Sequence, residues 1–254
     1  MNAQTSSAEK SIARKLVTLG FFLALLCALA AVFSGIGYQM KLWPFRTGFQ
    51  IIKVSFWVSV AAVVVSLLGL AISRKTRSVV VMGVIGVLVG AITIYIPLSY
   101  KRMVDSHPYI HDITTDTDNP PQFVVVASIR GPQDHPVTYD GPEVAAQQKQ
   151  AYPDLKPLVV NVPAGKVFEA ADQVVKDMGM DIVDASAPDL RIEATATSRL
   201  YGFKDDMVVR ITTETDGSTK VDVRSKSRVG RSDLGQNARR IREFLARLKT
   251  ALAA

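Results

Sequence analysis

The sequence predicts three N-terminal transmembrane α-helices followed by a C-terminal α+β domain, in which an antiparallel sheet packs on a long terminal helix. Three observations predict this architecture. Three long apolar stretches fill the first hundred residues, two alternating strands joined by a turn follow residue 200, and an amphipathic pattern ends the chain.

Charge is divided unevenly along the 254 residues, whose formal net charge is +7. Residues 1–102 hold 11 Lys and Arg against one acidic residue, Glu9, whereas residues 103–254 hold 19 against 22. The positive excess therefore flanks the apolar stretches, which argues against a nucleic-acid partner. The single cysteine, Cys27, excludes a disulfide framework and a cysteine metal site.

The apolar stretches are long enough to cross a membrane, since about 20 such residues span the hydrocarbon core. A polar tail, 1–15, which we expect in the cytoplasm, precedes an anchor over 16–100. The predicted spans are 16–38, 54–73 and 79–99. A signal peptide is the rival interpretation of the first stretch, but the stretch is too long and lacks a small-residue cleavage site.

Flanking cations predict the orientation of the anchor. Six cations lie on one side and five on the other: Lys10, Arg14, Lys15, Arg74, Lys75 and Arg77 against Lys41, Arg46, Lys53, Lys101 and Arg102. The positive-inside rule then places the N-terminus in the cytoplasm of a bacterial cell and the C-terminal domain in the periplasm, across the inner membrane.

Small residues recur along the second and third spans and indicate close helix packing: Ser55, Ser59, Ala62, Ser66, Gly69, Gly86 and Gly90. A homo-oligomer interface or a docking face for a larger membrane complex are the alternatives. No acidic residue or histidine lies inside a span, which argues against a proton-coupled transporter or a channel. Membrane lipid is the expected partner of these helices.

A linker rich in Pro and Asp, 101–157, is expected to wrap the folded domain, with one further strand at 123–127. The compact domain is predicted over 158–254. Its first helix has Val167, Phe168, Ala171, Val174, Val175 and Met178 on one face and ends at Gly179. The predicted order is β-α-β-β-β-β-α, similar in outline to helix-grip domains, which often enclose a hydrophobic ligand.

The last two strands form a hairpin whose register follows from its alternation. Only a three-residue turn, 215–217, sets Ile211 opposite Val221 and Arg210 opposite Asp222. The second strand then turns Val221, Val223, Ser225 and Ser227 inward, and it turns Lys220, Asp222, Arg224, Lys226 and Arg228 toward what we expect to be a wet, cationic face.

The terminal helix is predicted to start at Asp233, which caps it while Gln236 reaches back, and to end near Leu252. We expect Arg210, Asp222, Asp233 and Asn237 to belong to a structural polar network.

Several motifs resemble the signature of the domain of unknown function 1499 family, over roughly residues 111–250. They are Ile113–Asp116, Asn119–Phe123, Phe203–Asp206, Asp222–Ser225, Ser227–Gly235, Asn237 and Arg240–Ile241. The resemblance implies membership of a membrane-anchored branch of a family to which no activity is assigned.

Three chemistries compete at the predicted site. Asp205 and Asp206 are weak candidates for a catalytic carboxylate pair, with a structural ion network as the stronger alternative. Four arginines are candidates for binding an anionic ligand: Arg224, Arg228, Arg231 and Arg240. Three linker residues are weak metal-ligand candidates: His107, His111 and Asp112. His135 has no visible partner, and no cofactor is expected.

The sequence favours a non-enzymatic membrane protein whose exported domain binds a partner protein or an amphiphilic or anionic ligand, as an accessory subunit or assembly factor of a membrane complex. The alternative is a hydrolase-like envelope enzyme that uses Asp205 or Asp206. A cavity that reaches Asp206 would favour the enzyme, whereas carboxylates fully paired with Arg or Lys would favour the binding protein.

Overall fold

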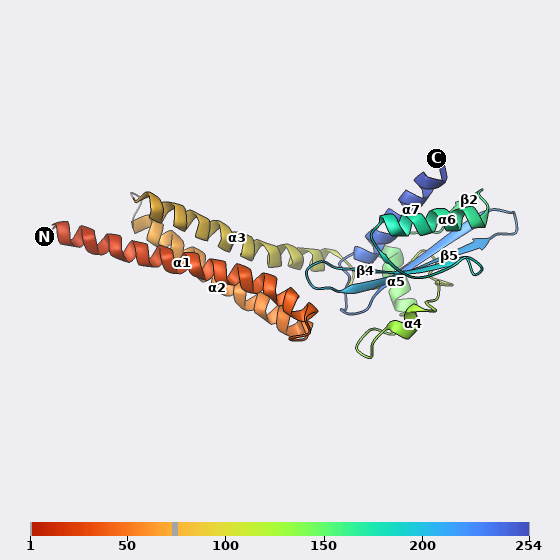
Figure 1. Cartoon of the computed structure of the whole chain (residues 1–254), viewed down its shortest axis with the longest axis horizontal. Helices are drawn as coiled ribbons and strands as arrows, with labels where there is room; N and C mark the ends of the chain where they lie inside the picture. The colour runs from red at the N-terminus through yellow and green to blue at the C-terminus, as the bar shows by residue number, and fades with distance from the viewer. Residues whose placement is uncertain (1, 73–75, 254) are drawn as a thin grey trace. The chain divides into compact units, whose positions relative to one another are not determined.

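The computed structural model describes residues 2–72 and 76–253, with side chains described from residue 9 onward (Figure 1). Arg74 and Lys75, which contribute to the predicted orientation, lie outside the described residues. The chain divides into two compact units. One comprises Met1–Met103 with Arg199–Gly202, and the other comprises Val104–Ser198 with Phe203–Ala254.

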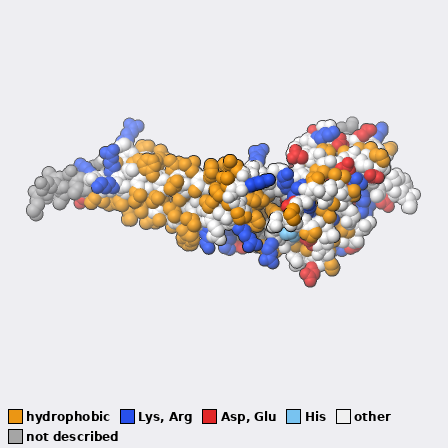
Figure 2. Space-filling model, turned by 60° about the horizontal axis from the view of Figure 1, so that its bottom comes forward, with side chains coloured by type: hydrophobic (Ala, Val, Ile, Leu, Met, Phe, Trp, Pro, Cys, Tyr) orange, Lys and Arg blue, Asp and Glu red, His pale blue; other side chains and the backbone are white. Residues whose placement is uncertain are grey.

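The first unit consists of three long helices, α1 (Asn2–Gln39), α2 (Phe45–Ile72) and α3 (Arg77–Ser106). Each contains an apolar stretch long enough to cross a membrane, as the sequence predicts. Figure 2 shows hydrophobic side chains over most of the visible surface of these helices, with Lys and Arg side chains gathered toward their ends. The helices therefore present to their surroundings the apolar surface that a lipid bilayer solvates.

Small residues let the three helices approach one another closely. A methyl group added to Gly20 of α1 would lie 2.2 Å from the Ser66 hydroxyl oxygen, and one added to Gly86 of α3 would lie 3.0 Å from the Cα of Phe21. Seven small residues on the predicted stripes are buried within this unit: Ser55, Ser59, Ala62, Ser66, Gly69, Gly86 and Gly90. Their burial is consistent with close packing of the helices within one chain.

The second unit is built on a sheet with strand order β1-β6-β5-β4-β3, in which β2 also pairs with β6. Every pairing is antiparallel. The strands are β1 (Asp112–Thr114), β2 (Leu158–Val160), β3 (Asp181–Ser186), β4 (Arg191–Thr197), β5 (Lys204–Thr213) and β6 (Thr219–Ser227). From residue 158 onward the observed order, β2-α6-β3-β4-β5-β6-α7, confirms the predicted order.

Two helices, α6 (Ala164–Asp177) and α7 (Gln236–Ala253), cover one face of the sheet (Figure 1). The core between them is aliphatic and closely filled. Val209, Val223, Ile241 and Phe244 are all fully buried there. The predicted apolar face of α6 is confirmed, and Gly179 ends that helix with a left-handed φ of 68°.

The hairpin register is as predicted. Ile211 lies opposite Val221, Arg210 lies opposite Asp222, and Gly217 takes a φ of 85° in the three-residue turn. The strand expected at 123–127 is wrong, because this segment runs into the short helix α4 (Val126–Ile129). Within the range predicted as a linker the structure also contains β1 and α5 (Pro142–Ala151).

Candidate functional site

The face of the sheet opposite α6 and α7 is buried, so the wet, cationic face expected from β6 is wrong. Asp222, Arg224 and Lys226 are each 0% exposed. Alternation shows which side chains share a face but not whether another segment covers it. Here residues 115–141 cover the face, and Phe123 and Val126 pack on Val208 of β5.

We call the buried charges on this face, together with those of the covering segment that meet them, the charged layer. Its members are Asp112, Asp116, Arg130, Asp140, Glu193, Asp206, Arg210, Asp222, Arg224, Lys226 and Arg228. Charges at this depth are tolerated only when they are paired and hydrogen-bonded.

Arg224 lies at the centre of the layer and is held by both sides of it. Its Nε and one terminal nitrogen donate to the two carboxylate oxygens of Asp112 at 2.9 and 2.8 Å. The guanidinium also donates to the carbonyls of Pro121 and Val137, and its carbon lies 5.1 Å from the ring centroid of Phe123. Each of its three nitrogens thus donates to a protein group.

Lys226 joins the sheet to the end of the covering segment. Its Nζ donates to the Thr138 carbonyl at 2.7 Å and to Asp140 at 2.6 Å, and it lies 3.2 Å from Asp112. His111 Nε2 lies 3.4 Å from the other oxygen of Asp140. Four titratable groups therefore meet at one end of the layer.

Asp206 is the better protected of the two predicted catalytic carboxylates. Arg228 donates to both of its oxygens at 2.8 and 2.9 Å, Arg130 donates at 2.9 Å, and the Thr195 hydroxyl donates at 2.7 Å. Burial disfavours the charged form of Arg228, but the hydrogen bonds to Asp206 outweigh it and raise the pKa of the guanidinium. Asp206 itself is 0% exposed.

A second ionic group surrounds Asp222. Arg210 donates to it at 2.9 Å, Lys220 lies 3.2 Å away, and both cations also reach Asp116 of the covering segment. Burial would raise the pKa of Asp116, yet the backbone N–H of Asn119 and the Lys220 ammonium outweigh it and hold that pKa below its usual value. The predicted pairing of Arg210 with Asp222 is thus part of a larger network.

Glu193 of β4 holds the start of α4. Its carboxylate accepts hydrogen bonds from the backbone N–H groups of Val124 and Val126 at 2.8 Å and from that of Val125 at 3.3 Å. Free N–H groups at a helix start favour a negative partner. A buried carboxylate on the sheet therefore positions a helix of the covering segment.

Asp205 lies on the other face of the sheet, where it accepts a hydrogen bond from Arg240 of α7 at 2.7 Å. Asp233 accepts hydrogen bonds from the N–H groups of Gly235 and Asn237 at 2.9 Å, but α7 begins at Gln236, three residues later than predicted, because Leu234 and Gly235 have left-handed φ angles of 54° and 76°. The reach-back expected of Gln236 is wrong: the Asp233 N–H donates to the Ile110 carbonyl, and the Gln236 side chain bonds Arg239. Burial raises the pKa of Asp233 despite its two N–H donors.

The four arginines proposed to bind an anion do not share one site. Arg224 pairs with Asp112, Arg228 with Asp206 and Arg240 with Asp205, while Arg231 stacks on the ring of Tyr109. Each of the first three is already bound to a carboxylate of the chain. The four residues predicted to form one structural polar network also lie in two places. Arg210 and Asp222 are in the charged layer, and Asp233 and Asn237 are at the start of α7.

Two histidines that the sequence pattern does not connect, His111 and His135, are in contact in the structure. The rings of His111 and His135 stack with centroids 4.1 Å apart, so the prediction that His135 has no partner is wrong. Burial lowers the pKa of His111; the Asp140 carboxylate opposes this, and His135 and Lys226 add to it. Within the described residues, no group of three or more His, Cys, Asp or Glu could hold a metal, and His107 and Asp112 have other neighbours.

An open groove of about 590 Å³ lies between the covering segment and α5. The loop Thr117–Gln122, Tyr139 and α5 residues from Pro142 to Lys149 line it. The Tyr139 hydroxyl is buried and has no hydrogen-bond partner in the part of the chain that the structure describes. Burial and the nearby Asp112 raise its pKa to about 12, so the hydroxyl remains a donor.

These observations define a class: a protein with three membrane-spanning helices and an α+β domain whose sheet is closed on its second face by a charged layer. The chain belongs to the family described as "Protein of unknown function (DUF1499)", whose model matches residues 112–248. The match begins at β1 and therefore includes the covering segment.

Comparison with other proteins adds a distant structural similarity. The chain is similar to the protein in the "Crystal structure of Ara h 8.0201", at 15% sequence identity and a TM-score of 0.22, over 39% of this chain and 96% of that one. No curated protein matches the chain.

Proposed function

We propose that this protein acts by binding a partner polypeptide at its membrane-anchored domain, and that it is not an enzyme. The observation that carries the proposal is the complete pairing of Asp206 with Arg228, Arg130 and Thr195 at 0% exposure. A catalytic carboxylate must reach its substrate and exchange a proton with it. Asp205 is paired with one cation, Arg240.

The packing of the helix face supports a polypeptide partner over an enclosed amphiphile. Val209, Val223, Ile241 and Phe244 fill the space between the sheet and α7, where a helix-grip domain would hold its ligand. The groove beside α5 is open instead, and its lining mixes apolar and polar residues. Such a lining suits the alternating carbonyls and side chains of a peptide segment.

A photocrosslinking amino acid placed in the groove tests this proposal in native membranes. We expect discrete adducts from Gln122 and from Ala146, both exposed residues of the groove. The matched control is Glu169, which is exposed on α6. Absence of adducts at both groove positions, or equal adducts at Glu169, would refute the proposal.

The enzyme alternative has its own test. If Asp206→Asn preserved the folded domain but abolished a cellular phenotype of the wild type, Asp206 would have a chemical role. We expect the reverse, a loss of stability that accounts for any loss of phenotype, because the amide cannot pair with two guanidinium groups.

We further propose that the helices lie in a bacterial inner membrane with the domain in the periplasm, where it acts as an accessory subunit or assembly factor of a membrane complex. The cation distribution of the sequence supports this orientation.

A further inference from the structure

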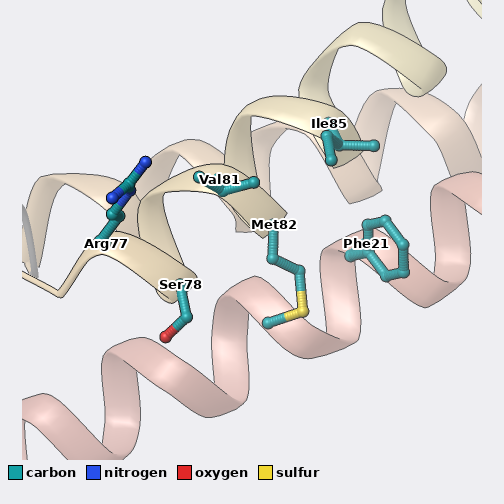
Figure 3. Close-up of a pocket in the computed structure, with 6 residues that line it drawn as sticks. All are labelled: Phe21, Arg77, Ser78, Val81, Met82 and Ile85. Carbon is teal, nitrogen blue, oxygen red and sulfur yellow. The ribbon is translucent and has the colours of Figure 1, made fainter.

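The helical unit has a groove between α1 and α3 that the packing of small residues leaves open. Its volume is about 570 Å³, and Figure 3 shows the side chains that line it: Phe21, Arg77, Ser78, Val81, Met82 and Ile85. Further along α3, Gly86 contacts α1 and Gly90 lies against Val63 of α2, so the helices are close there. The groove lies on the N-terminal side of those contacts.

The inner part of the groove is apolar. Met82 points toward α1 and Phe21 rises from α1 below Ile85 (Figure 3). Val81 and Ile85 are 50% and 44% exposed, and they belong to a helix long and apolar enough to cross a membrane. An apolar wall at this position is in contact with lipid chains, so a hydrocarbon chain is its natural occupant.

The outer end of the groove is polar and cationic. Arg77 is the first residue of α3, and its side chain points away from α1, whereas the Ser78 hydroxyl points toward α1 (Figure 3). Both residues are exposed. A headgroup seated at this end would therefore meet a guanidinium and a hydroxyl beside the apolar wall.

Two cations of α1 reach the same level. Three helices joined by short connections make α1 and α3 run in the same direction, and Gly86 lies beside Phe21. Counting back nine residues from Gly86 and from Phe21 sets Arg77 at the same height along the helix axis as residue 12. At a rise of 1.5 Å per residue, Arg14 and Lys15 are therefore within about 5 Å of Arg77 along that axis. Glu9 is the only acidic residue among the first 102.

We propose that this groove binds one molecule of an anionic phospholipid. One acyl chain lies along Phe21, Met82 and Ile85, and the phosphate and its negatively charged headgroup face Arg77. The cations select an anionic lipid over a zwitterionic one, because the second carries its own positive charge toward them. This site is independent of the binding proposed for the domain.

Native mass spectrometry of the full-length chain in mild detergent tests the proposal with two lipids of identical acyl chains. We expect phosphatidylglycerol to be retained in excess over phosphatidylcholine, and Arg77→Gln to lower that excess about fivefold, the contribution of one cation near a lipid surface. Arg46→Gln is the matched control, since Arg46 is an exposed cation in the first turn of α2, away from the groove. Equal retention of the two lipids by the wild type would overturn the proposal.

A second variant tests the groove itself without changing charge. Met82→Trp fills the apolar part, and we expect it to reduce retention of both lipids while the chain stays helical by circular dichroism. Retention unchanged in Met82→Trp, or unchanged in Arg77→Gln, would show that lipid binds elsewhere and would overturn the assignment.

Discussion

Arg224 and Asp112, which are 112 residues apart in the chain, form a two-bonded ion pair in which both side chains are 0% exposed. One partner belongs to the central strand β6 and the other to the short strand β1. The pair therefore joins two neighbouring strands on the covered face of the sheet, and Arg224 reaches the covering segment through the carbonyls of Pro121 and Val137.

Breaking this pair from one side should cost far more than removing both charges. We expect Arg224→Met to lower the free energy of unfolding of the domain by about 3–5 kcal/mol, because Asp112 is left buried without its partner. The double variant Arg224→Met, Asp112→Leu should lose less than the sum of the two single variants. Pulse proteolysis in urea on the detergent-solubilised protein measures this.

The exposed pair of Lys149 and Asp118 supplies the control. Lys149→Met should change the same free energy by less than about 1 kcal/mol, since water screens an exposed pair. An effect of Arg224→Met as small as that of Lys149→Met would contradict the importance assigned to the buried pair.

Replacing Glu193 should loosen α4 without unfolding the sheet. In Glu193→Gln one carboxylate oxygen becomes an amide group, so the N–H groups of Val124 and Val126 compete for the single oxygen left. We expect hydrogen exchange at these two amides to quicken by about tenfold, equivalent to about 1.4 kcal/mol. The amide of Val174 in α6 should be unaffected, and equal acceleration there would indicate global destabilisation.

The stability of the domain should fall as the pH drops through the range in which His111 titrates. The pKa of His111 is lowered in the folded state, so below about pH 6.5 the unfolded chain takes up a proton that the folded chain resists. Stability is therefore retained above the unfolded pKa and decreases by up to about 1.4 kcal/mol per pH unit below it.

Calorimetry between pH 5 and pH 8 measures this dependence. His111→Gln should reduce the slope, because the group that resists protonation beside His135 and Lys226 is gone. An identical slope in wild type and His111→Gln would assign the effect to another group.

Reporter fusions test the proposed orientation. Alkaline phosphatase fused after the last residue should be active, and green fluorescent protein fused there should be dark, because only the phosphatase folds to an active form outside the cytoplasm. The cation distribution predicts this result. A fluorescent protein fusion together with an inactive phosphatase fusion would show the opposite orientation, with the domain in the cytoplasm.

The elements that could be predicted from the sequence are those in which apolar residues recur at regular intervals. The alternation of Val and Arg along β6 sufficed for the hairpin register, and the apolar face of α6 follows the helical period. In both cases one side of the element packs on aliphatic neighbours, so apolar residues recur in the sequence with the period of a strand or a helix.

The covering segment has no such periodic pattern of apolar residues. It holds Arg224 and Lys226 largely through backbone carbonyls, those of Pro121, Val137 and Thr138. Every residue has a carbonyl, so a segment that binds through carbonyls leaves no distinctive side-chain pattern. The stacking of His111 on His135 likewise depends on a path of the chain that periodicity does not describe.

A signal for the charged layer was nevertheless present. Asp222, Arg224, Lys226 and Arg228 alternate along one strand, and acidic residues are frequent between 112 and 140. A cationic strand face and an acidic segment carry opposite charges, which indicates that the two can pack together and neutralise each other. Weighing that balance, rather than alternation alone, would have predicted a covered face.

The bidentate hold of Asp112 on Arg224 sets a practical limit on how the domain can be prepared. A soluble fragment that begins at residue 158 would keep Arg224 and Lys226 but lose their partners Asp112 and Asp140, so it would expose two unmatched cations. It would also expose the apolar surface of Val208, on which Phe123 packs. The shortest self-sufficient piece therefore has to start ahead of Ile110, whose side chain is 1% exposed in the core.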